Sequence, residues 1–259
     1  MAWNPRQYER FQAARLRPGL DLMAALPSLQ PERVVDLGCG TGVLTRRLAD
    51  LHPMAQVIGL DSSTAMLARA AREPSRVTWE AGDIARWHPP GPVDLIFSNA
   101  ALHWLPGHDG LFARLIGALT PGGVLAVQMP RNFASPSHRL LRETAAEGVW
   151  AARLNGIFRE EPVHPPEWYW RCLAPLCGHV EIWETDYLHA LDGPDPVLEW
   201  VKGTALLPVM EALRGAELDG FLAAYAARLR DAYPPEPSGI TLFPFRRLFV
   251  IAQARDEIH

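Results

Sequence analysis

The sequence predicts an α/β fold built on a doubly wound, mostly parallel sheet. Short runs of β-branched and apolar residues alternate with stretches of helical periodicity from residue 34 onward, and turns rich in glycine or proline separate them. Each strand-helix-strand repeat implies a right-handed crossover between parallel strands. The strands are expected at residues 34–38, 57–61, 77–83, 93–99, 123–129 and 179–191, and a final strand at 247–254 completes the sheet.

Helices are expected between these strands, where apolar residues recur at helical spacing. The first begins directly at a glycine-rich turn, and the second begins at Ser62-Ser63, whose hydroxyl groups suit an N-cap. The link before the fourth strand is rich in proline and should hold no more than one turn of helix. The expected helices span residues 43–51, 63–72, 110–119, 138–154, 197–204 and 218–232.

The chain length favours one domain that carries an insertion. A chain of 259 residues can bury one full hydrophobic core. The stretch after Pro130 is polar, aromatic and interrupted by prolines, which is typical of a lid. We therefore expect a single domain over residues 1–259, with a core at 30–130 and 179–254, an N-terminal cap segment at 1–29 and a helical insertion at 131–178.

The composition favours an enzyme that acts on a small molecule. Hydrophobic residues make up 48% and charged residues 21% of the chain, which excludes a disordered or fibrous protein. The formal net charge is −4 and no long basic run is present, so the charge pattern of a nucleic-acid or membrane-surface protein is missing. We expect a small anionic substrate, no nucleic-acid or membrane partner, and a monomer or weak homodimer.

The cysteines and the N-terminal segment indicate the compartment. Cys39, Cys172 and Cys177 lack the paired spacing of a zinc site, so we expect no metal and no disulfide framework. Residues 1–11 carry no signal-peptide pattern, and no apolar run reaches the length that crosses a membrane. A cytoplasmic location is therefore expected.

The turn after the first strand, Asp36-Leu37-Gly38-Cys39-Gly40-Thr41-Gly42, predicts the cofactor. A dinucleotide fingerprint needs a small residue at position 43 to admit a pyrophosphate, but that residue is Val43. Asp36 would repel a phosphate, and it suits the amino-acid part of an adenosyl sulfonium. Gly38 and Gly40 let the backbone pass close to such a ligand. A tight turn that binds no ligand is the alternative.

Acids at two further strand ends fit the same cofactor. Asp61 ends the second strand, where a carboxylate accepts both hydroxyl groups of a ribose; its alternative role is to cap the helix that begins near Ser63. Gly82-Asp83-Ile84 follows the third strand and offers an acid and an apolar neighbour to adenine, with Met66 a candidate for the other face of the base or for the helix core. The predicted cofactor-binding residues are Asp36, Gly38, Cys39, Gly40, Asp61, Ser62, Met66, Asp83, Ile84, Asn99 and Ala100.

These motifs together resemble a known class of enzymes. The glycine turn, Gly59-Leu60-Asp61, Gly82-Asp83-Ile84 and the strand 94–99 are similar to the motifs of class I S-adenosylmethionine-dependent methyltransferases, over about residues 34–130. The resemblance implies a Rossmann-like fold and S-adenosyl-L-methionine as the cofactor. Asn99 to Trp104 follow the fourth strand, so in that fold they lie over the cofactor, close to where a methyl group would leave.

A narrower resemblance covers nearly the whole chain. Trp3-Asn4-Pro5, Trp104-Leu105-Pro106, Val127-Gln128-Met129-Pro130 and Arg247-Leu248-Phe249 resemble the trans-aconitate 2-methyltransferase family within that class. This resemblance implies a sheet of seven strands with the last one antiparallel. It also implies an O-methyltransferase that forms a methyl ester on a carboxylate of a small tricarboxylic acid.

A tricarboxylate needs several arginine forks, because its carboxyl groups are ionised at neutral pH. An exposed ion pair is the alternative role for each arginine. An ionised carboxylate also needs no general base, so we predict no proton-transfer residue and only the positioning groups Tyr8, His103 and Trp104. The predicted substrate-binding residues are Arg15, Arg17, Asn132, Tyr169, Tyr187, Arg246 and Arg247.

Three other functions stay open at this point. A methyltransferase for another small carboxylate, an amine or a hydroxyl fits the same cofactor motifs. A non-catalytic module that binds S-adenosylmethionine would also lack a general base. A nicotinamide-dependent oxidoreductase is disfavoured by Asp36 and Val43.

Overall fold

The structure is a computed structural model that describes residues 11–158 and 162–256, and a seven-stranded sheet organises them. The strands lie in the order β3-β2-β1-β4-β5-β7-β6. Parallel pairs join β3 to β2, β2 to β1, β1 to β4 and β4 to β5, whereas β7 is antiparallel to β5. The strands are β1 (Arg33–Leu37), β2 (Gln56–Asp61), β3 (Thr78–Ala81), β4 (Val93–Asn99), β5 (Leu119–Pro130), β6 (Cys177–Leu191) and β7 (Thr241–Ala254).

This topology confirms the predicted doubly wound, mostly parallel sheet and its antiparallel last strand. β7 lies between β5 and β6, so the edge of the sheet on that side is β6. β6 begins two residues before its predicted start and ends at the predicted residue 191, whereas β7 begins six residues before the predicted residue 247 and ends at the predicted residue 254.

The chain divides into two compact units. Of the described residues, the larger unit holds 15–130, 162–185 and 247–256, and the smaller unit holds 11–14, 131–158 and 186–246. This division differs from the expected insertion at 131–178. The helix α8 (Pro166–Leu173) belongs to the larger unit because Tyr169 packs on Phe112 of α5 (His108–Gly117), with ring centroids 5.1 Å apart.

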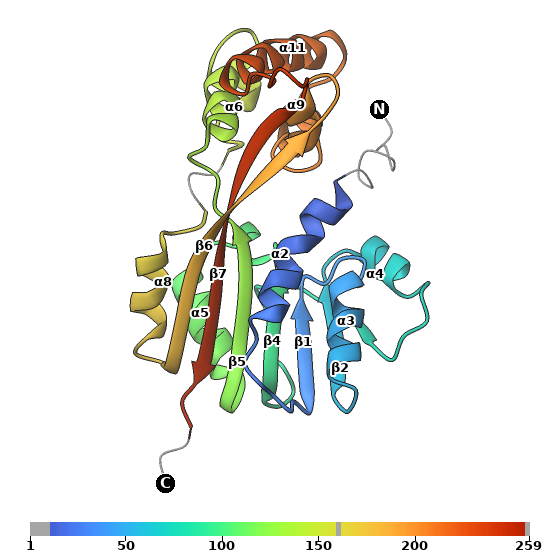
Figure 1. Cartoon of the computed structure of the whole chain (residues 1–259), viewed down its shortest axis with the longest axis vertical. Helices are drawn as coiled ribbons and strands as arrows, with labels where there is room; N and C mark the ends of the chain where they lie inside the picture. The colour runs from blue at the N-terminus through green and yellow to red at the C-terminus, as the bar shows by residue number, and fades with distance from the viewer. Residues whose placement is uncertain (1–10, 159–161, 257–259) are drawn as a thin grey trace. The chain divides into compact units, whose positions relative to one another are not determined.

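In the larger unit the helices cover both faces of the sheet. Figure 1 shows α3 (Val43–Leu51) and residues 15–24 of α2 (Gln12–Ala24) in front of the strands, and α5 (His108–Gly117) behind them. The central strands β1, β4 and β5 are almost wholly buried, as expected when helices cover a parallel sheet on both sides. The predicted helix at 43–51 is confirmed to the residue. The helix α4 (Thr64–Ala70) lies in the crossover between β2 and β3.

The smaller unit has its own core. It contains α6 (Pro136–Ala146), α7 (Ala151–Leu154), α9 (Pro196–Lys202), α10 (Leu207–Ala212) and α11 (Gly215–Ala232), with parts of β6 and β7. Trp200, Phe221 and Phe243 are buried at its centre. Burying a large apolar side chain contributes about 1.5–3 kcal/mol, so this cluster can hold the unit together.

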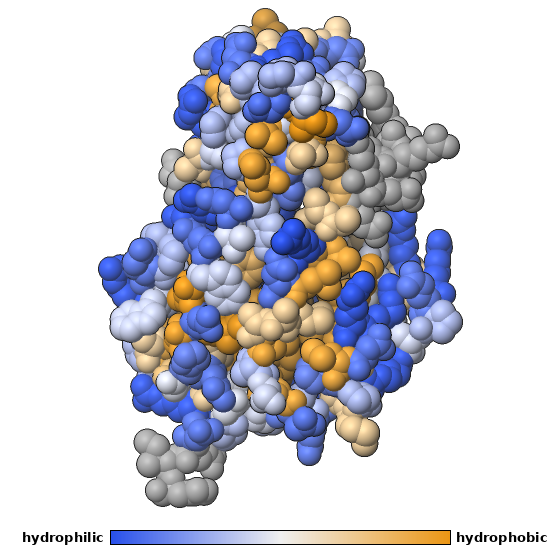
Figure 2. Space-filling view, viewed as in Figure 1, coloured by the Kyte–Doolittle hydropathy of each residue, from blue (hydrophilic) through white to orange (hydrophobic). Residues whose placement is uncertain are grey.

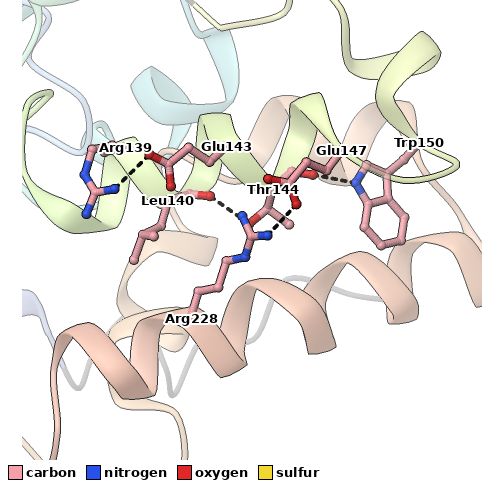
Figure 3. Close-up of polar contacts among 7 residues, drawn as sticks. All are labelled: Arg139, Leu140, Glu143, Thr144, Glu147, Trp150 and Arg228. Atoms are coloured by element: carbon pink, nitrogen blue, oxygen red, sulfur yellow. Dashed lines mark hydrogen bonds and ion pairs between the residues drawn. The ribbon is translucent and has the colours of Figure 1, made fainter.

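Polar contacts fasten α6 to its neighbours in the smaller unit (Figure 3). The indole Nε1 of Trp150 donates to the carbonyl of Thr144 at 2.6 Å, and Arg228 of α11 pairs with Glu147 just after α6. Arg139 and Glu143 form an i,i+4 pair along α6. These exposed pairs each contribute about 0–1 kcal/mol, so apolar packing dominates the stability of the unit.

The surface of the larger unit is mixed in character. On the face shown in Figure 2, hydrophilic side chains surround smaller groups of hydrophobic ones. Of the helices in the described part of the chain, none has the length and the apolar character needed to cross a membrane. Nor do three His, Cys, Asp or Glu side chains gather there as a metal site requires, and the three cysteines are free thiols.

Candidate functional site

The turn between β1 and α3 is a glycine loop in left-handed conformation. Gly38, Gly40 and Gly42 have φ angles of 79°, 55° and 74°, which residues with a Cβ avoid. The N–H of Gly38 donates to the carbonyl of Leu60 at 2.8 Å. A Cβ added at Gly38 would lie 2.2 Å from that of Ala101, whereas one at Gly40 would meet no described atom within 4 Å. The loop thus packs tightly at Gly38 and faces open space at Gly40.

The carboxylate of Asp61 ties this loop to the end of β2. Its Oδ2 accepts from the N–H of Gly40 and its Oδ1 from the N–H of Ser63, both at 2.8 Å. Ser63 itself caps α4, because its Oγ accepts from the N–H of Met66 at 3.3 Å. The cap role considered for Asp61 therefore belongs to Ser63. Each Asp61 oxygen keeps a second lone pair, so the carboxylate can still accept two ribose hydroxyls.

Asp36 lies at the base of the loop and is 2% exposed. Its Oδ2 accepts a hydrogen bond of 2.6 Å from the Thr45 hydroxyl. Burial raises the pKa of Asp36 to about 7, the charge of Asp61 adds to the rise, and the Thr45 bond opposes it. Near neutral pH a cation bound close to Asp36 would therefore favour its ionised form.

Sequence reasoning missed Trp79, which explains two of the glycines. A Cβ at Gly42 would lie 2.2 Å from the Trp79 ring, and one at Gly59 would lie 2.5 Å from it. Trp79 comes from β3 and packs over both positions, so neither tolerates a side chain. A large aromatic residue in a short strand next to two glycine motifs was the available signal.

The other predicted cofactor residues surround the same loop or lie on its neighbouring turns. Burial and the charges of nearby acids raise the pKa of the Cys39 thiol, so it stays neutral. Ile84 comes within 3.6 Å of a Cβ added at Gly38. Met66 is half-buried on α4, and Ser62 and Asp83 are exposed. Their roles toward the cofactor stay predictions.

The chain turns sharply after β4. Ala100 has a φ of 53°, a left-handed conformation that costs a residue other than glycine about 1–3 kcal/mol. Its N–H donates to the carbonyl of Gln128 at 2.9 Å. The turn sets Ala101 against Gly38 and leaves Asn99 half-buried at the end of the strand. Asn99 and Ala100 therefore lie on the turn that packs against the glycine loop, and their predicted role toward the cofactor stays a prediction.

The short helix η1 (Leu102–Trp104) follows this turn and carries two predicted positioning groups. His103 is 7% exposed and Trp104 is 54% exposed, and their ring centroids are 4.6 Å apart. The third predicted positioning group, Tyr8, lies outside the described residues. The positioning roles of these groups stay predictions.

Tyr169 holds the loop after η1 in place. The Nε2 of His108 lies 3.0 Å from the carbonyl of Leu102 and must donate to it, so its Nδ1 accepts from the Tyr169 hydroxyl at 2.6 Å. The N–H of His164 donates to the same hydroxyl at 3.3 Å. Because Tyr169 is fully buried and its hydroxyl is engaged on both sides, its predicted substrate role is replaced by a structural one.

The two arginines of α2 point in different directions. Arg15 lies one helical turn before Gly19, so the two share a face of the helix. That face packs on the sheet, since a Cβ at Gly19 would lie 3.1 Å from Cγ of Asn99. Arg17 lies on the other side, with its side chain 72% exposed and 3.7 Å from Asp21. The structure thus places Arg15 and Arg17 on different faces of α2. Arg17 forms an exposed ion pair, which was considered as the alternative to substrate binding.

Alternation along β7 separates the second pair in the same way. Arg247 is 6% exposed and shares a face of the strand with the buried Phe249, whereas Arg246 points to the opposite face. Arg246 forms two hydrogen bonds with Asp186, at 2.9 and 2.8 Å, and this holds the pKa of Asp186 below its usual value. Arg246 therefore forms the surface ion pair that was considered as its alternative, and its predicted role toward a substrate stays a prediction.

The remaining predicted substrate residues belong to the smaller unit. Asn132 is 4% exposed and Tyr187 is 8% exposed, so both are buried. The Tyr187 ring stacks on that of His189, with centroids 6.4 Å apart. Their roles toward a substrate stay predictions.

Comparison with known proteins finds a family model that matches the central part of the larger unit, and relatives that match nearly the whole chain. Residues 34–123 match a family model described as a methyltransferase domain. A trans-aconitate 2-methyltransferase of Azoarcus sp. (strain BH72) is 46% identical over 250 residues, which cover 96% of this chain and 98% of that protein. One from Streptomyces avermitilis is 46% identical over 260 residues, which cover 97% of this chain and 96% of that protein.

Solved structures share the fold at lower identity. An S-adenosylmethionine-dependent methyltransferase from Mesorhizobium loti is 23% identical, with a TM-score of 0.52 over 94% of this chain and 99% of that one. The YcgJ protein from Bacillus subtilis is 14% identical, with a TM-score of 0.59 over the same shares of the two chains. At these identities the likeness shows the fold alone.

Proposed function

The chain belongs to the family of trans-aconitate 2-methyltransferases, and we propose that it transfers a methyl group from S-adenosyl-L-methionine to a carboxylate of trans-aconitate. The product of this reaction is a methyl ester. The observation that supports an anionic acceptor is Arg247, a buried cation near the end of the sheet where Asn99 and the glycine loop lie. Arg15 adds a second cation on the helix face that packs on Asn99.

The residues around the glycine loop fit the cofactor. Gly40 faces open space, and Asp61 keeps two lone pairs for a ribose. Asp36 lies buried beneath the loop and suits a positive charge nearby. When bound, the cofactor supplies an electrophilic methyl group on a positively charged sulfur.

The chain's own contribution is to bind, orient and exclude water. A free carboxyl group has a pKa near about 4, so the acceptor is already ionised and no residue has to remove a proton. Holding two reactants in line at contact distance can lower a barrier by about 7–11 kcal/mol. Arg247 would bind a carboxylate as a fork, and the buried surroundings would strengthen that bond.

A panel assay tests this function directly. The purified chain is incubated with cofactor labelled in the methyl group and, in separate reactions, with trans-aconitate, cis-aconitate, isocitrate and citrate. We expect the highest kcat/KM with trans-aconitate and a product that releases methanol on alkaline hydrolysis. Transfer to none of the acids, together with transfer to an amine or an alcohol, would contradict the proposal. A cytoplasmic location and a monomer or weak homodimer stay predictions.

A further inference from the structure

Gln128 of β5 is a fully buried amide that the structure leaves unsatisfied. Its exposed fraction is 0%, and neither its Nε2 nor its Oε1 has a hydrogen-bond partner in the described part of the chain. Oδ1 of Asn99 is buried and in the same condition. An unpaired buried polar group costs about 1–3 kcal/mol, so such groups are rare unless a ligand completes them.

The strand register places these two amides side by side. Asn99 of β4 pairs with Gln128 of β5 in a parallel ladder, so their side chains point to the same face of the sheet. Gln128 in turn pairs with Phe249 of β7, which puts Arg247, two residues earlier, on that face as well. Asn99, Gln128 and Arg247 thus form a row on one face of the sheet. Asn99 is half-buried, so this row is accessible to solvent at the Asn99 end.

The order of the strands fixes how far each group lies from the cofactor loop. The glycine loop follows β1, and β4, β5 and β7 succeed it across the sheet. Neighbouring strands lie about 4.8 Å apart, so Gln128 is about two such spacings from the loop and Arg247 about three. A reacting carboxylate must lie on the loop side of the acceptor, and therefore nearer to Gln128 than to Arg247.

The chemistry of the two groups matches this order. An arginine fork engages both oxygens of a carboxylate, which suits a group that must only be held. A single amide N–H engages one oxygen and leaves the other free to attack. The Nε2 of Gln128 has two hydrogens, and neither is used among the described residues, so it can donate to one acceptor oxygen.

On the basis of the proposed function, we propose that Gln128 binds the carboxylate that is methylated and thereby determines which carboxylate reacts. Arg247 then holds a carboxylate that does not react. Gln128 touches the acceptor in this arrangement and is therefore a specificity-determining residue of the reaction.

The test replaces Gln128 with methionine, which has similar length and no amide. We expect Gln128→Met to lower kcat with trans-aconitate about tenfold or more, because one orienting hydrogen bond to a charged group is worth about 1.5–3 kcal/mol. The affinity for the cofactor should stay within about twofold of the wild type. We expect the wild type to give a single positional isomer of the monoester and Gln128→Met to give a mixture, which proton NMR resolves.

Gln253 offers a matched control in the same unit. It lies on β7, and its Nε2 donates to the carbonyl of Gly122 at 3.0 Å. Gln253→Met should leave kcat and the isomer unchanged and should lower the melting temperature. Gln128→Met removes an unsatisfied group, so its melting temperature should not fall.

The outcomes separate the two proposals. Unchanged kcat and an unchanged isomer in Gln128→Met would overturn the role of Gln128 while the proposed function stands. A wild-type chain that methylates none of the four acids would overturn the proposed function, and this inference with it. If Gln128→Met does not fold, Gln128→Glu keeps the shape of the side chain. Its negative charge would repel the acceptor carboxylate and should abolish turnover. A Gln128→Glu variant with normal kcat would equally overturn the inference.

Discussion

The glycine loop and the neighbouring sheet face differ in how their polar groups are satisfied. At the loop, Asp36 is bonded to Thr45, and Asp61 holds two backbone N–H groups. On the sheet face, Gln128 and Asn99 keep buried atoms without partners among the described residues. The loop is therefore preorganised by the chain itself, whereas the face depends on what binds to it. Under the proposed function, the cofactor would bind at the loop and the acceptor at the unsatisfied groups of the sheet face.

Asp61 gives the largest expected effect on the loop side of this comparison. Asp61→Ala removes the carboxylate that holds Gly40 and would accept the ribose hydroxyls. Two charged hydrogen bonds together are worth about 3 kcal/mol or more, so we expect the cofactor Kd to rise at least about 100-fold. Calorimetry with S-adenosylhomocysteine measures the Kd. A Kd within about threefold of the wild type would show that the loop does not bind the nucleoside.

Arg247 gives the next largest effect, on the acceptor side. Arg247→Ala should raise the acceptor KM about 30-fold, as expected for one lost charged bond, and should leave the cofactor KM nearly unchanged. Arg246→Ala is the matched control, because that side chain is bonded to Asp186 on the opposite face of the strand. Steady-state kinetics with either reactant varied gives both constants. Equal effects of the two variants would remove the distinction between inward and outward arginines.

The arginines of α2 sharpen the same comparison at a smaller scale. Arg15 is half-buried on the face with Gly19, so Arg15→Ala should raise the acceptor KM about tenfold. Arg17→Ala removes an exposed pair with Asp21, and pairs of this kind contribute about 0–1 kcal/mol. We expect its KM to change less than about twofold. A larger effect from Arg17 would reverse the assignment of the two helix faces.

Asp36 gives the smallest expected effect, seen in the pH dependence. Its pKa of about 7 means that a cationic cofactor binds best when Asp36 has ionised, so affinity should improve about threefold from pH 6 to pH 8. S-adenosylhomocysteine lacks the sulfonium charge and should respond less. In Asp36→Asn the improvement should vanish. A profile that is equally steep in the variant would assign the titration to another group.

The same carboxyl group makes a prediction for stability. A carboxyl whose pKa is raised on folding stabilises the fold fully below its unfolded value near 4, and this contribution is lost as the pH rises through about 7. The unliganded wild type should therefore lose thermal stability relative to Asp36→Asn between pH 5 and pH 8. Melting curves at matched ionic strength measure the difference. A constant difference across this range would contradict the raised pKa.

The loop could be predicted from the sequence because its signals are local. Asp36, the three glycines and Asp61 lie at strand ends that periodicity locates, and the structure has β1, α3 and β2 where they were expected. The acceptor face could not be predicted in this way. Choosing Arg15 over Arg17 requires the orientation of α2, and assigning Tyr169 to packing requires its contact with α5. Gln128 reads as an ordinary strand residue until the register of three strands is known.

The division into units escaped sequence reasoning for a related reason. The helices α9, α10 and α11 have the same local pattern as core helices, and only the hydrophobic cluster that they share assigns them to the smaller unit. The long strands β6 and β7 also contain residues of both units, and no change of composition along either strand marks the boundary between the units.

The place of β7 between β5 and β6 has a consequence for biosynthesis. β6 is made about fifty residues before β7, yet its only neighbour in the described sheet is β7. During translation, β6 therefore has no strand partner among the described residues until β7 has left the ribosome, while β1 to β5 can already assemble. A nonsense mutation ahead of residue 241 would thus remove β7 and leave β5 and β6 without the strand that lies between them. It would also delete Arg247.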